Sequence, residues 1–391
     1  MTKKYNYLFI IIILLIILLG NITLIRTQKE TSHKENRTLQ KFEHFTLNSY
    51  LNGVFQSNLE TAFSDQFIGG ETIKSNLKEL LNLFDYNNIP SSICKNKYVK
   101  LSGSYYNFNC GDSIISKYIT EEEKDIQNIK DRINVYNKLN DYVDTYYYFI
   151  STSNIYNFKE NKYSVDVLKI LNENLKGKYR LSSLEFKDYN EFTKYFYKTD
   201  HHWNHVGSYE AYKDIIKMIR PRDQQFEPLK ELVFEDIIFY GSSARVNQIF
   251  DFKEKFKVYK FDLPNMKIMI NKTEGKYGSE LEYENLIYNK EKTANHYALY
   301  YGDDLAEVVF EAKNGKYNLL ILGSSFTNSV DKLIASHFNK TFDVDLRHYE
   351  KTFKEKFNIK EYIKKNNIDK VLIIADYNFL IDDNFDIEWS E

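Results

Sequence analysis

Cysteine, proline and an excess of charge of either sign are all scarce in this chain. Its two cysteines, Cys94 and Cys110, permit at most one internal disulfide, and two cysteines alone do not establish that they pair. Lysine and arginine total 53, and aspartate and glutamate total 55, so the net charge of −2 provides no general attraction to nucleic acid. No nucleic-acid partner is therefore expected. Four prolines beside frequent Lys, Asn, Ile and Tyr are typical of a low-GC genome, and the 33 tyrosines need no functional reason.

Long apolar runs are also scarce, because only one is present, at the N-terminus. Residues 5–25 follow Lys3 and Lys4 and contain no charge. About 20 apolar residues cross a bilayer as a helix, and the lysines favour a cytoplasmic start. The segment lacks a small-residue cleavage pattern, which favours an uncleaved anchor over a signal peptide. The sequence predicts a single-pass cell-membrane protein with a cytoplasmic segment at 1–4, a transmembrane signal anchor at 5–25, an extracytoplasmic linker at 26–50 and an extracytoplasmic C-terminal domain.

Residues 51–391 are predicted to form that domain. The hydrophobic content of 43% is ample for a packed core. Patterns of apolar residues predict, in order, a helical element at 51–83, a hairpin or loop at 97–110, a charged helix at 120–139, a buried strand at 146–150, and helices at 164–175, near 191 and at 208–219. From 226 to about 313, short aromatic and apolar alternations predict a β-rich insertion.

The C-terminal part carries the clearest evidence for fold class. The pattern predicts strands and helices in alternation, namely a strand at 318–322, a helix at 327–338, a strand at 342–346, a helix at 354–365 and a strand at 370–375. Such alternation predicts an α/β fold, a parallel sheet with helices on both faces. Reactive groups in these folds collect where the strands end, and Ser325 follows the first of these strands directly.

Two short motifs contain a carboxylate, an imidazole and a hydroxyl. The first is Thr-Asp-His-His-Trp-Asn-His at 199–205, just before a predicted helix, and the second is Gly-Ser-Ser-Phe at 323–326. A serine hydroxyl needs a base before it can attack an ester at neutral pH, and the base needs an orienting acid. Asp200, His202 and Ser325 are the candidates for acid, base and nucleophile.

Other interpretations of these residues remain open. A serine after a strand and a glycine is most often a turn or a helix cap. Asp200, His201, His202 and His205 are metal-ligand types, but no His-Glu-x-x-His motif and no second acidic cluster accompanies them. We therefore predict no metal and no cofactor. His201 and Trp203 are expected to pack or to stack against substrate.

These motifs resemble those of the bacterial DHHW family. They also resemble, more broadly, the SGNH-hydrolase-like proteins that O-acetylate alginate and other exopolysaccharides. The resemblance rests on Asp-His-His-Trp at 200–203, its most specific element, and extends to 63–67, 239–245, 323–326 and 345–349. It implies an SGNH-hydrolase-like (flavodoxin-like) sheet over most of the domain.

Carried over residue by residue, the resemblance implies that Ser325 is the nucleophile, His202 the general base and Asp200 the residue that orients the base. The commoner turn in the family is Gly-Asp-Ser-Phe, and here Ser324 stands where that aspartate would be. The departure leaves the nucleophile in place and puts in question the hydrogen bonds that fix the turn.

The resemblance also implies a function and its partners. Backbone amides at the turn are the first expected oxyanion donors, with Asn378 or Arg245 as side-chain donors. The expected enzyme is an O-acetyltransferase or acetylesterase acting on a cell-surface polysaccharide or exopolysaccharide, and a transferase would need a membrane partner that delivers acyl groups. The alternative is a carbohydrate- or wall-binding protein of the same fold that has lost its chemistry. Transfer and hydrolysis share one acyl-serine and differ only in the acceptor.

Overall fold

The computed structural model describes most of residues 99–385 and parts of the chain before them. The described residues are 18, 20–23, 27–29, 31–32, 37–42, 44–52, 54–67, 99–102, 105–110, 113–118, 122–158, 160–176, 180–247, 249–250, 252–278, 295–385, 387 and 389. The chain divides into two compact units, Met1–Ile89 and Pro90–Glu391. Each unit is described by itself.

The first unit contains short strands and helices. β1 (Thr31–Ser32) pairs antiparallel with β2 (Arg37–Thr38), and α2 (Leu47–Leu51) precedes α3 (Val54–Gln66). Gln66 is buried and exchanges two hydrogen bonds of 2.9 Å with the backbone of Lys29, one as donor and one as acceptor. The helical element predicted over 51–83 is thus observed as far as residue 66, and its remainder lies outside the described residues.

The predicted membrane location is corrected by the structure. Within the residues that it describes, no helix is long and apolar enough to cross a membrane. The prediction of a single-pass cell-membrane protein is therefore wrong on this evidence. Most of the predicted span 5–25 lies outside the described residues, and so does Cys94, whose pairing with Cys110 stays open.

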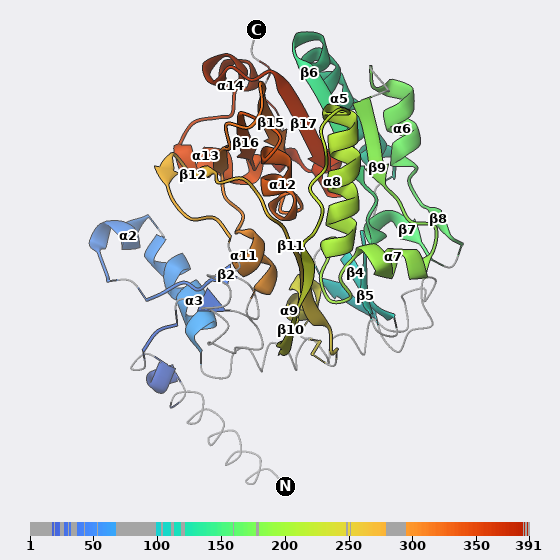
Figure 1. The fold of residues 1–391 in the computed structure, drawn as a ribbon. Helices are drawn as coiled ribbons and strands as arrows, with labels where there is room; N and C mark the ends of the chain where they lie inside the picture. The colour runs from blue at the N-terminus through green and yellow to red at the C-terminus, as the bar shows by residue number, and fades with distance from the viewer. Residues whose placement is uncertain are drawn as a thin grey trace. The chain divides into compact units, whose positions relative to one another are not determined.

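An eight-stranded sheet organises the second unit (Figure 1). Its strands, in spatial order, are β13 (Thr273–Glu274), β12 (Lys267–Ile270), β14 (Glu307–Glu311), β16 (Lys340–Val344), β15 (Asn318–Leu322), β17 (Lys370–Ala375), β6 (Asp144–Ile150) and β9 (Leu181–Leu184). The five strands from β16 to β9 are parallel, and β14, β12 and β13 continue the sheet antiparallel. The predicted α/β class with a parallel-rich sheet is confirmed.

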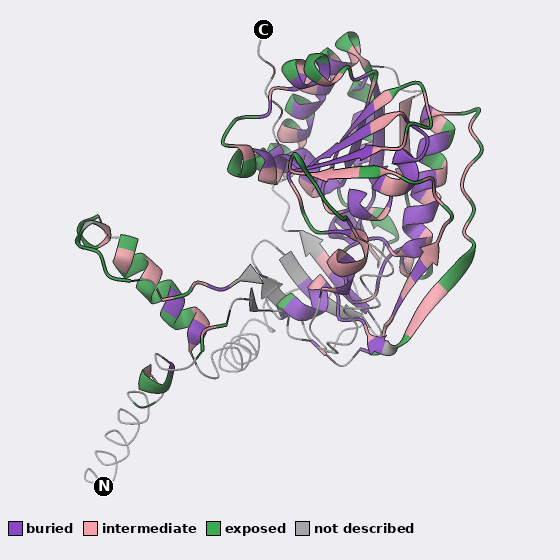
Figure 2. Cartoon of the chain, turned by 60° about the vertical axis from the view of Figure 1, so that its left-hand side comes forward, coloured by how far each residue is buried: buried purple, intermediate pink, exposed green. Residues whose placement is uncertain are grey.

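Neighbouring side chains on one strand point to opposite faces of the sheet. The Tyr147 hydroxyl donates to the carbonyl of Tyr136 on α5 (Glu122–Tyr142) at 3.1 Å. Tyr148 instead lies with its ring centroid 6.5 Å from that of Trp203, just before α8 (His205–Ile219). Helices α5 and α8 therefore cover opposite faces, and the strands between them are buried (Figure 2).

Five helices share a core cluster with the α5 face of the sheet. They are α5, α6 (Val167–Asn174), α13 (Leu346–Phe353), α14 (Ile359–Asn366) and α15 (Tyr377–Ile381). On the other face, Ala335 of α12 (Asp331–Ala335) packs with Val308 and Phe310 of β14. The intervening Val309 belongs to the first cluster, as the two-residue period of a strand requires.

The predicted β-rich insertion is only partly an insertion. β10 (Lys230–Ile238) and β11 (Lys255–Lys260) form a separate antiparallel ribbon, but β12, β13 and β14 extend the main sheet. The described residues of this region also include the helices α9 (Ser242–Asn247) and α11 (His296–Tyr301). The sequence left the pairing of these strands open, because alternation in a short strand does not specify its partner.

Other elements agree with the prediction more closely. β3 (Val99–Ser102), β4 (Tyr105–Cys110) and β5 (Ser113–Tyr118) form an antiparallel sheet, so the segment predicted at 97–110 as a hairpin or loop is a hairpin. β7 (Tyr156–Asn157) and β8 (Lys162–Tyr163) make a small ribbon. The helix predicted at 327–338 is a 3₁₀ turn (Thr327–Ser329) followed by α12.

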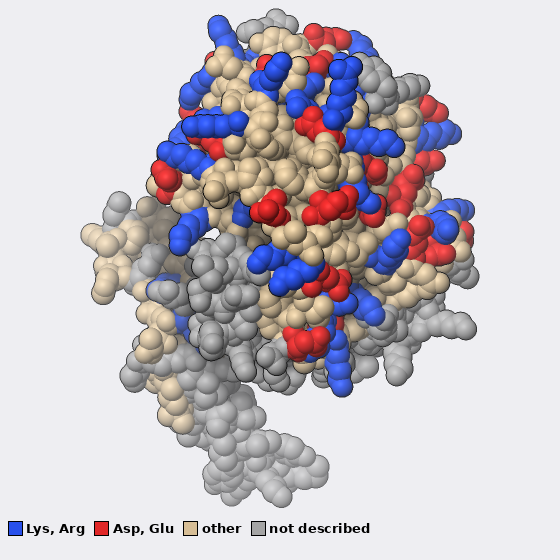
Figure 3. Space-filling model, viewed as in Figure 1, with Lys and Arg blue, Asp and Glu red and all other residues tan. Residues whose placement is uncertain are grey.

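Charged side chains are mixed on the surface. On the described part of the face in Figure 3, Lys and Arg lie among Asp and Glu, without a large field of one sign. This distribution agrees with the near-zero net charge.

Candidate active site

The Asp-His-His-Trp motif lies in a tight loop between α7 (Tyr189–Tyr195) and α8. A bridge between Phe196 and Trp203 closes the loop. The Asn204 side chain then begins α8 by accepting hydrogen bonds from the N–H groups of Val206 and Gly207. The loop is thus held at both ends.

Three of the predicted residues meet in this loop and at the end of β15. Asp200 Oδ1 lies 2.6 Å from His202 Nδ1 and accepts from the His202 backbone N–H at 3.0 Å. His202 Nε2 lies 2.8 Å from Ser325 Oγ. A carboxylate that accepts from Nδ1–H leaves Nε2 as the acceptor for the serine proton. The arrangement can therefore transfer the hydroxyl proton to the imidazole.

The Asp200 carboxyl is held in its charged form. Burial alone would raise its pKa, but the neighbouring His202 ring, with smaller effects from His201 and Arg245, keeps the pKa well below its usual range. Oδ2 also accepts from the Ser242 backbone N–H at 2.6 Å. The carboxylate therefore has a partner on each oxygen.

Gly241 lets a second segment approach Asp200 closely. A Cβ at position 241 would lie 2.3 Å from Asp200 Cβ, so only glycine fits without a shift. The next residue, Ser242, supplies the N–H to Asp200, and its Oγ lies 2.6 Å from His201 Nδ1. The motif at 239–245 thus forms a wall of the site, although the sequence did not indicate which of its residues make the contacts.

Glu254 supports the loop from outside the motifs. Its carboxylate accepts from the Lys198 N–H at 2.8 Å, the Thr199 N–H at 3.0 Å and the Thr199 hydroxyl at 2.7 Å. Burial raises the pKa of Glu254 to about 7, although these donors oppose the shift. No pattern in the sequence indicated this residue.

Two aromatic rings enclose His202. The Tyr297 ring stacks on the imidazole with centroids 4.1 Å apart and an interplanar angle of 6°. Phe326 approaches edge-on at 5.0 Å. The Tyr297 hydroxyl also donates to the Ser325 carbonyl at 3.0 Å. Tyr297 is a single tyrosine in a tyrosine-rich chain, so the sequence gave no reason to select it.

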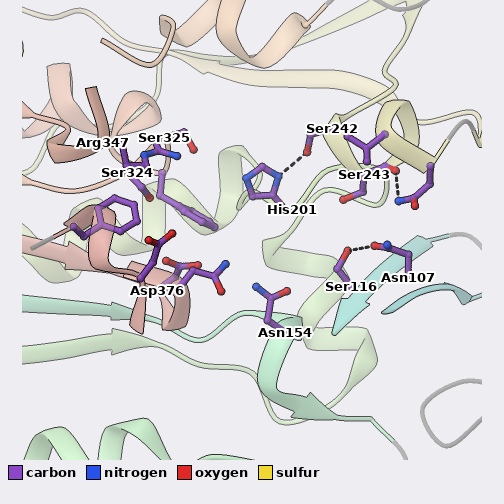
Figure 4. A pocket seen from close by; sticks show the side chains of 16 residues that line it. Asn107, Ser116, Asn154, His201, Ser242, Ser243, Ser324, Ser325, Arg347 and Asp376 are labelled. Carbon is purple, nitrogen blue, oxygen red and sulfur yellow. Dashed lines mark hydrogen bonds between the residues drawn. The ribbon is translucent and has the colours of Figure 1, made fainter. Parts of the chain in front are cut away.

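A pocket of about 400 Å³ opens beside Ser325 (Figure 4). Its lining comes from the ends of four parallel strands, from the loop before α8, and from β4, β5 and α9. The polar members are Asn107, Ser116, Asn154, His201, Ser242, Ser243, Asn247, Ser324, Ser325, Arg347, Asp376, Asn378 and Asp382, and the apolar members are Val246, Phe326 and Phe385. Asp376, which follows β17, also caps a helix: it begins α15 by accepting a hydrogen bond from the Phe379 N–H. Helix capping therefore helps to place polar groups at the pocket.

The other four predicted site residues, Asn378, His201, Trp203 and Arg245, separate into two groups. Asn378 and His201 line the pocket. Trp203 and Arg245 are fully buried and do not line it. Trp203 Nε1 donates to Ser329 Oγ at 2.6 Å, and the Arg245 guanidinium donates to the Tyr240 carbonyl at 2.8 Å.

Asn154 also lines the pocket and was not among the predicted site residues. It ends the polar stretch 151–154 that follows β6. The sequence indicates that such a polar strand end leads into a site, without selecting Asn154 itself.

Among the residues that the structure describes, two clusters hold side chains of metal-ligand type. Asp200, His201 and His202 form one, and the other is Asp304, Asp345 and His348. In the first, both nitrogens of His202 already face Asp200 and Ser325. In the second, the Arg347 cation lies against both carboxylates, with Nε 3.0 Å from Asp345 Oδ1 and an amino group 3.4 Å from Asp304.

Comparison with known proteins identifies relatives by fold. No family model and no curated protein sequence matches the chain. Bacillus cereus PatB1 with a sulfonyl adduct matches at 19% identity and a TM-score of 0.56, over 74% of this chain and 99% of that one. A second PatB1 structure matches at 22% identity and a TM-score of 0.54, over 73% of this chain and 100% of that one.

A DHHW family protein from Eubacterium siraeum matches at 15% identity and a TM-score of 0.54, over 73% of this chain and 95% of that one. These likenesses confirm the predicted resemblance at the level of the fold.

Proposed function

We propose that this chain is an acyl-serine enzyme of the SGNH type, an O-acetyltransferase or acetylesterase that acts on a polysaccharide. The observation that carries the proposal is the unbroken series of contacts from Asp200 through His202 to Ser325, at 2.6 and 2.8 Å, beside an open pocket. Nine of the 16 lining residues carry an amide or hydroxyl group, and such groups hydrogen-bond sugar hydroxyls. Phe385 supplies an apolar surface.

The proposed reaction begins at Ser325. Oγ attacks the acyl carbonyl carbon while His202 Nε2 takes its proton, and Asp200 stabilises the resulting imidazolium. His202 then gives the proton to the leaving oxygen, and the acyl-serine remains. A sugar hydroxyl or water next loses a proton to His202 Nε2 and attacks the acyl carbon. The bond from that carbon to Ser325 Oγ breaks, and His202 returns the proton to Oγ. For transfer to a sugar, the membrane partner expected from the resemblance would deliver the acyl group.

The oxyanion would be held at the Ser325 turn. We assign this role to backbone N–H groups of the turn together with Asn378, whose side chain lines the same pocket. Arg245 is reassigned to an indirect role, because it is fully buried and acts electrostatically on Asp200. Trp203 is reassigned to packing for the same reason of burial.

The substitution at Ser324 is compatible with a fixed turn. The Ser324 carbonyl accepts from the Thr327 N–H at 2.8 Å and from the Thr327 hydroxyl at 3.1 Å. Thr327 thus holds the backbone that carries the nucleophile, without an aspartate at position 324. This favours a working site over the degenerate binding protein that the sequence left open.

The test uses a sulfonyl fluoride, since one PatB1 structure carries a sulfonyl adduct. An activated serine attacks the sulfur and expels fluoride, so intact mass spectrometry of the full chain should show one added sulfonyl group. Ser325→Ala and His202→Ala should remain unlabelled, whereas the control Ser182→Ala, on the edge strand β9, should label like the wild type. Equal absence of labelling in all four proteins would overturn the enzymatic proposal in favour of the binding protein.

A second measurement separates transfer from hydrolysis. Release of p-nitrophenol from p-nitrophenyl acetate is followed with and without cellohexaose. An acetylated sugar, detected by mass spectrometry, indicates transfer, and free acetate alone indicates hydrolysis.

A further inference from the structure

We propose that Tyr297 is a positioning residue that holds Ser325 and His202 in their reactive geometry. The inference rests on the proposed function and extends it to a residue outside both motifs. Tyr297 lies on the short helix α11, is 3% exposed, and contacts both members of the pair at once.

The ring of Tyr297 fixes the imidazole plane. Its centroid lies 4.1 Å from that of the His202 ring, and the two ring planes are nearly parallel, at 6°. The plane of the Phe326 ring is inclined at 64° to that of the imidazole. Rotation of the imidazole would collide with these rings and break the contacts of its two nitrogens. The electron-rich ring face also favours a cation, so the stacking should be stronger once His202 has taken the serine proton. An interaction that strengthens in the transition state raises kcat.

The hydroxyl of Tyr297 fixes the nucleophile. It donates to the backbone carbonyl of Ser325 at 3.0 Å, and therefore anchors the peptide from which Oγ projects. Burial raises the pKa of Tyr297 well above its usual range, so the hydroxyl stays a donor. One rigid side chain thus sets the distance between base and nucleophile, which lie 123 positions apart in sequence.

The experiment compares three variants of the full chain in p-nitrophenyl acetate turnover and in the rate of sulfonyl labelling. Tyr297→Phe keeps the ring and removes one hydrogen bond, so kcat should fall about fivefold. Tyr297→Leu removes both contacts, and kcat should fall about 100-fold, as expected for reacting groups displaced by about 1 Å. KM should change less than about twofold in both, because neither contact is made to substrate.

Tyr301→Leu is the matched control. Tyr301 lies on the same helix, with its ring centroid 5.0 Å from that of Tyr297. The Tyr301→Leu variant should keep kcat within about twofold of the wild type, because the Tyr301 side chain makes none of the contacts to Ser325 and His202 described above. Equal losses in Tyr301→Leu and Tyr297→Leu, or wild-type kcat in both folded Tyr297 variants, would overturn the inference. If Tyr297→Leu does not fold, Tyr297→Phe decides the matter alone.

Labelling separates this inference from the proposed function. A wild type that takes no sulfonyl group refutes the acyl-serine site itself. A wild type that is labelled, with Tyr297 variants labelled equally fast, refutes only the role of Tyr297.

Discussion

Replacing Gly241 with alanine should disable the proposed site without changing any reacting group. The new Cβ would lie 2.3 Å from Asp200 Cβ and 2.6 Å from both Cα and Oδ2 of Asp200. Ordinary contact begins at 3.4 Å, so the two segments must separate by about 1 Å. These atoms belong to the backbone and the short side chain of Asp200, and a change of rotamer cannot remove the clash with Cα and Cβ.

A displacement of that size is large compared with the contacts it affects. Asp200 lies 2.6 Å from His202 Nδ1 on one side and 2.6 Å from the Ser242 N–H on the other. Adding about 1 Å takes either contact beyond hydrogen-bonding distance. A misplacement of about 1 Å costs about 10²-fold in rate, and complete loss of the orienting carboxylate about 10⁴-fold. The expected loss in kcat for Gly241→Ala therefore lies between these limits, or about 3–5 kcal/mol of barrier.

The assay is p-nitrophenyl acetate turnover together with the thermal unfolding midpoint. Gly275→Ala is the control, because its Cβ would first meet Ile270 Cδ1 at 3.1 Å, the far end of a flexible side chain. That variant should keep wild-type kcat within about twofold. Wild-type kcat and an unchanged midpoint in Gly241→Ala would refute the reasoning, since they would show that the 241 turn moves without disturbing Asp200.

Three further changes test other parts of the site. Trp203→Phe removes the hydrogen bond to Ser329 and should lower the free energy of unfolding by about 1–2 kcal/mol in urea titrations. KM should not change, because Trp203 is buried and does not line the pocket. Asn378→Ala should lower kcat about 10²-fold in p-nitrophenyl acetate turnover if its amide supports the oxyanion, and an unchanged kcat would remove it from that role. Burial raises the pKa of Glu254 from 4.5 to about 7, so between about pH 5 and 7 the folded chain keeps a proton on this carboxyl that the unfolded chain has lost, and the contribution of Glu254 to stability should fall as pH rises through that window. Glu254→Gln should remove this contribution in unfolding titrations at pH 5, 6, 7 and 8. Other buried groups add to the slope of both proteins: Asp343, whose pKa burial raises to about 7, acts in the same direction, and His201 and His296, whose pKa burial lowers to about 3 and about 4, act in the opposite direction.

The parallel core of the fold could be predicted because few arrangements satisfy its pattern. The continuous apolar strands at 318–322 and 370–375, separated by helices, require cover on both faces of a sheet. The same argument placed Ser325 at the carboxyl edge. A serine that needs a base then made the Asp-x-His pair at 200 and 202 the natural partner.

Other elements could not be predicted because their partners are chosen by packing. The helix predicted at 354–365 begins only at residue 359, since Lys354 adopts a left-handed conformation that ends the preceding α13 and Asn358 begins α14 by accepting from the Glu361 N–H. The alternation of side chains in a short strand such as β12 is compatible with pairing to any of several strands. Only the assembled sheet selects β14 as the partner of β12.

The residues that the sequence did not indicate, Gly241 and Tyr297, act through contacts between segments that are distant in the sequence. Ser325 and Asn378 follow strands, so the sheet places them, and the sheet is visible in the sequence. Asp200 and His202 are placed by a loop whose position depends on Gly241 from one side and Tyr297 from the other. Gly241 and Tyr297 carry no reactive group, so the sequence did not select them as site residues, although Gly241 lies in the segment 239–245 of the resemblance. The distance between base and nucleophile is therefore determined by residues that a search for reactive groups does not consider.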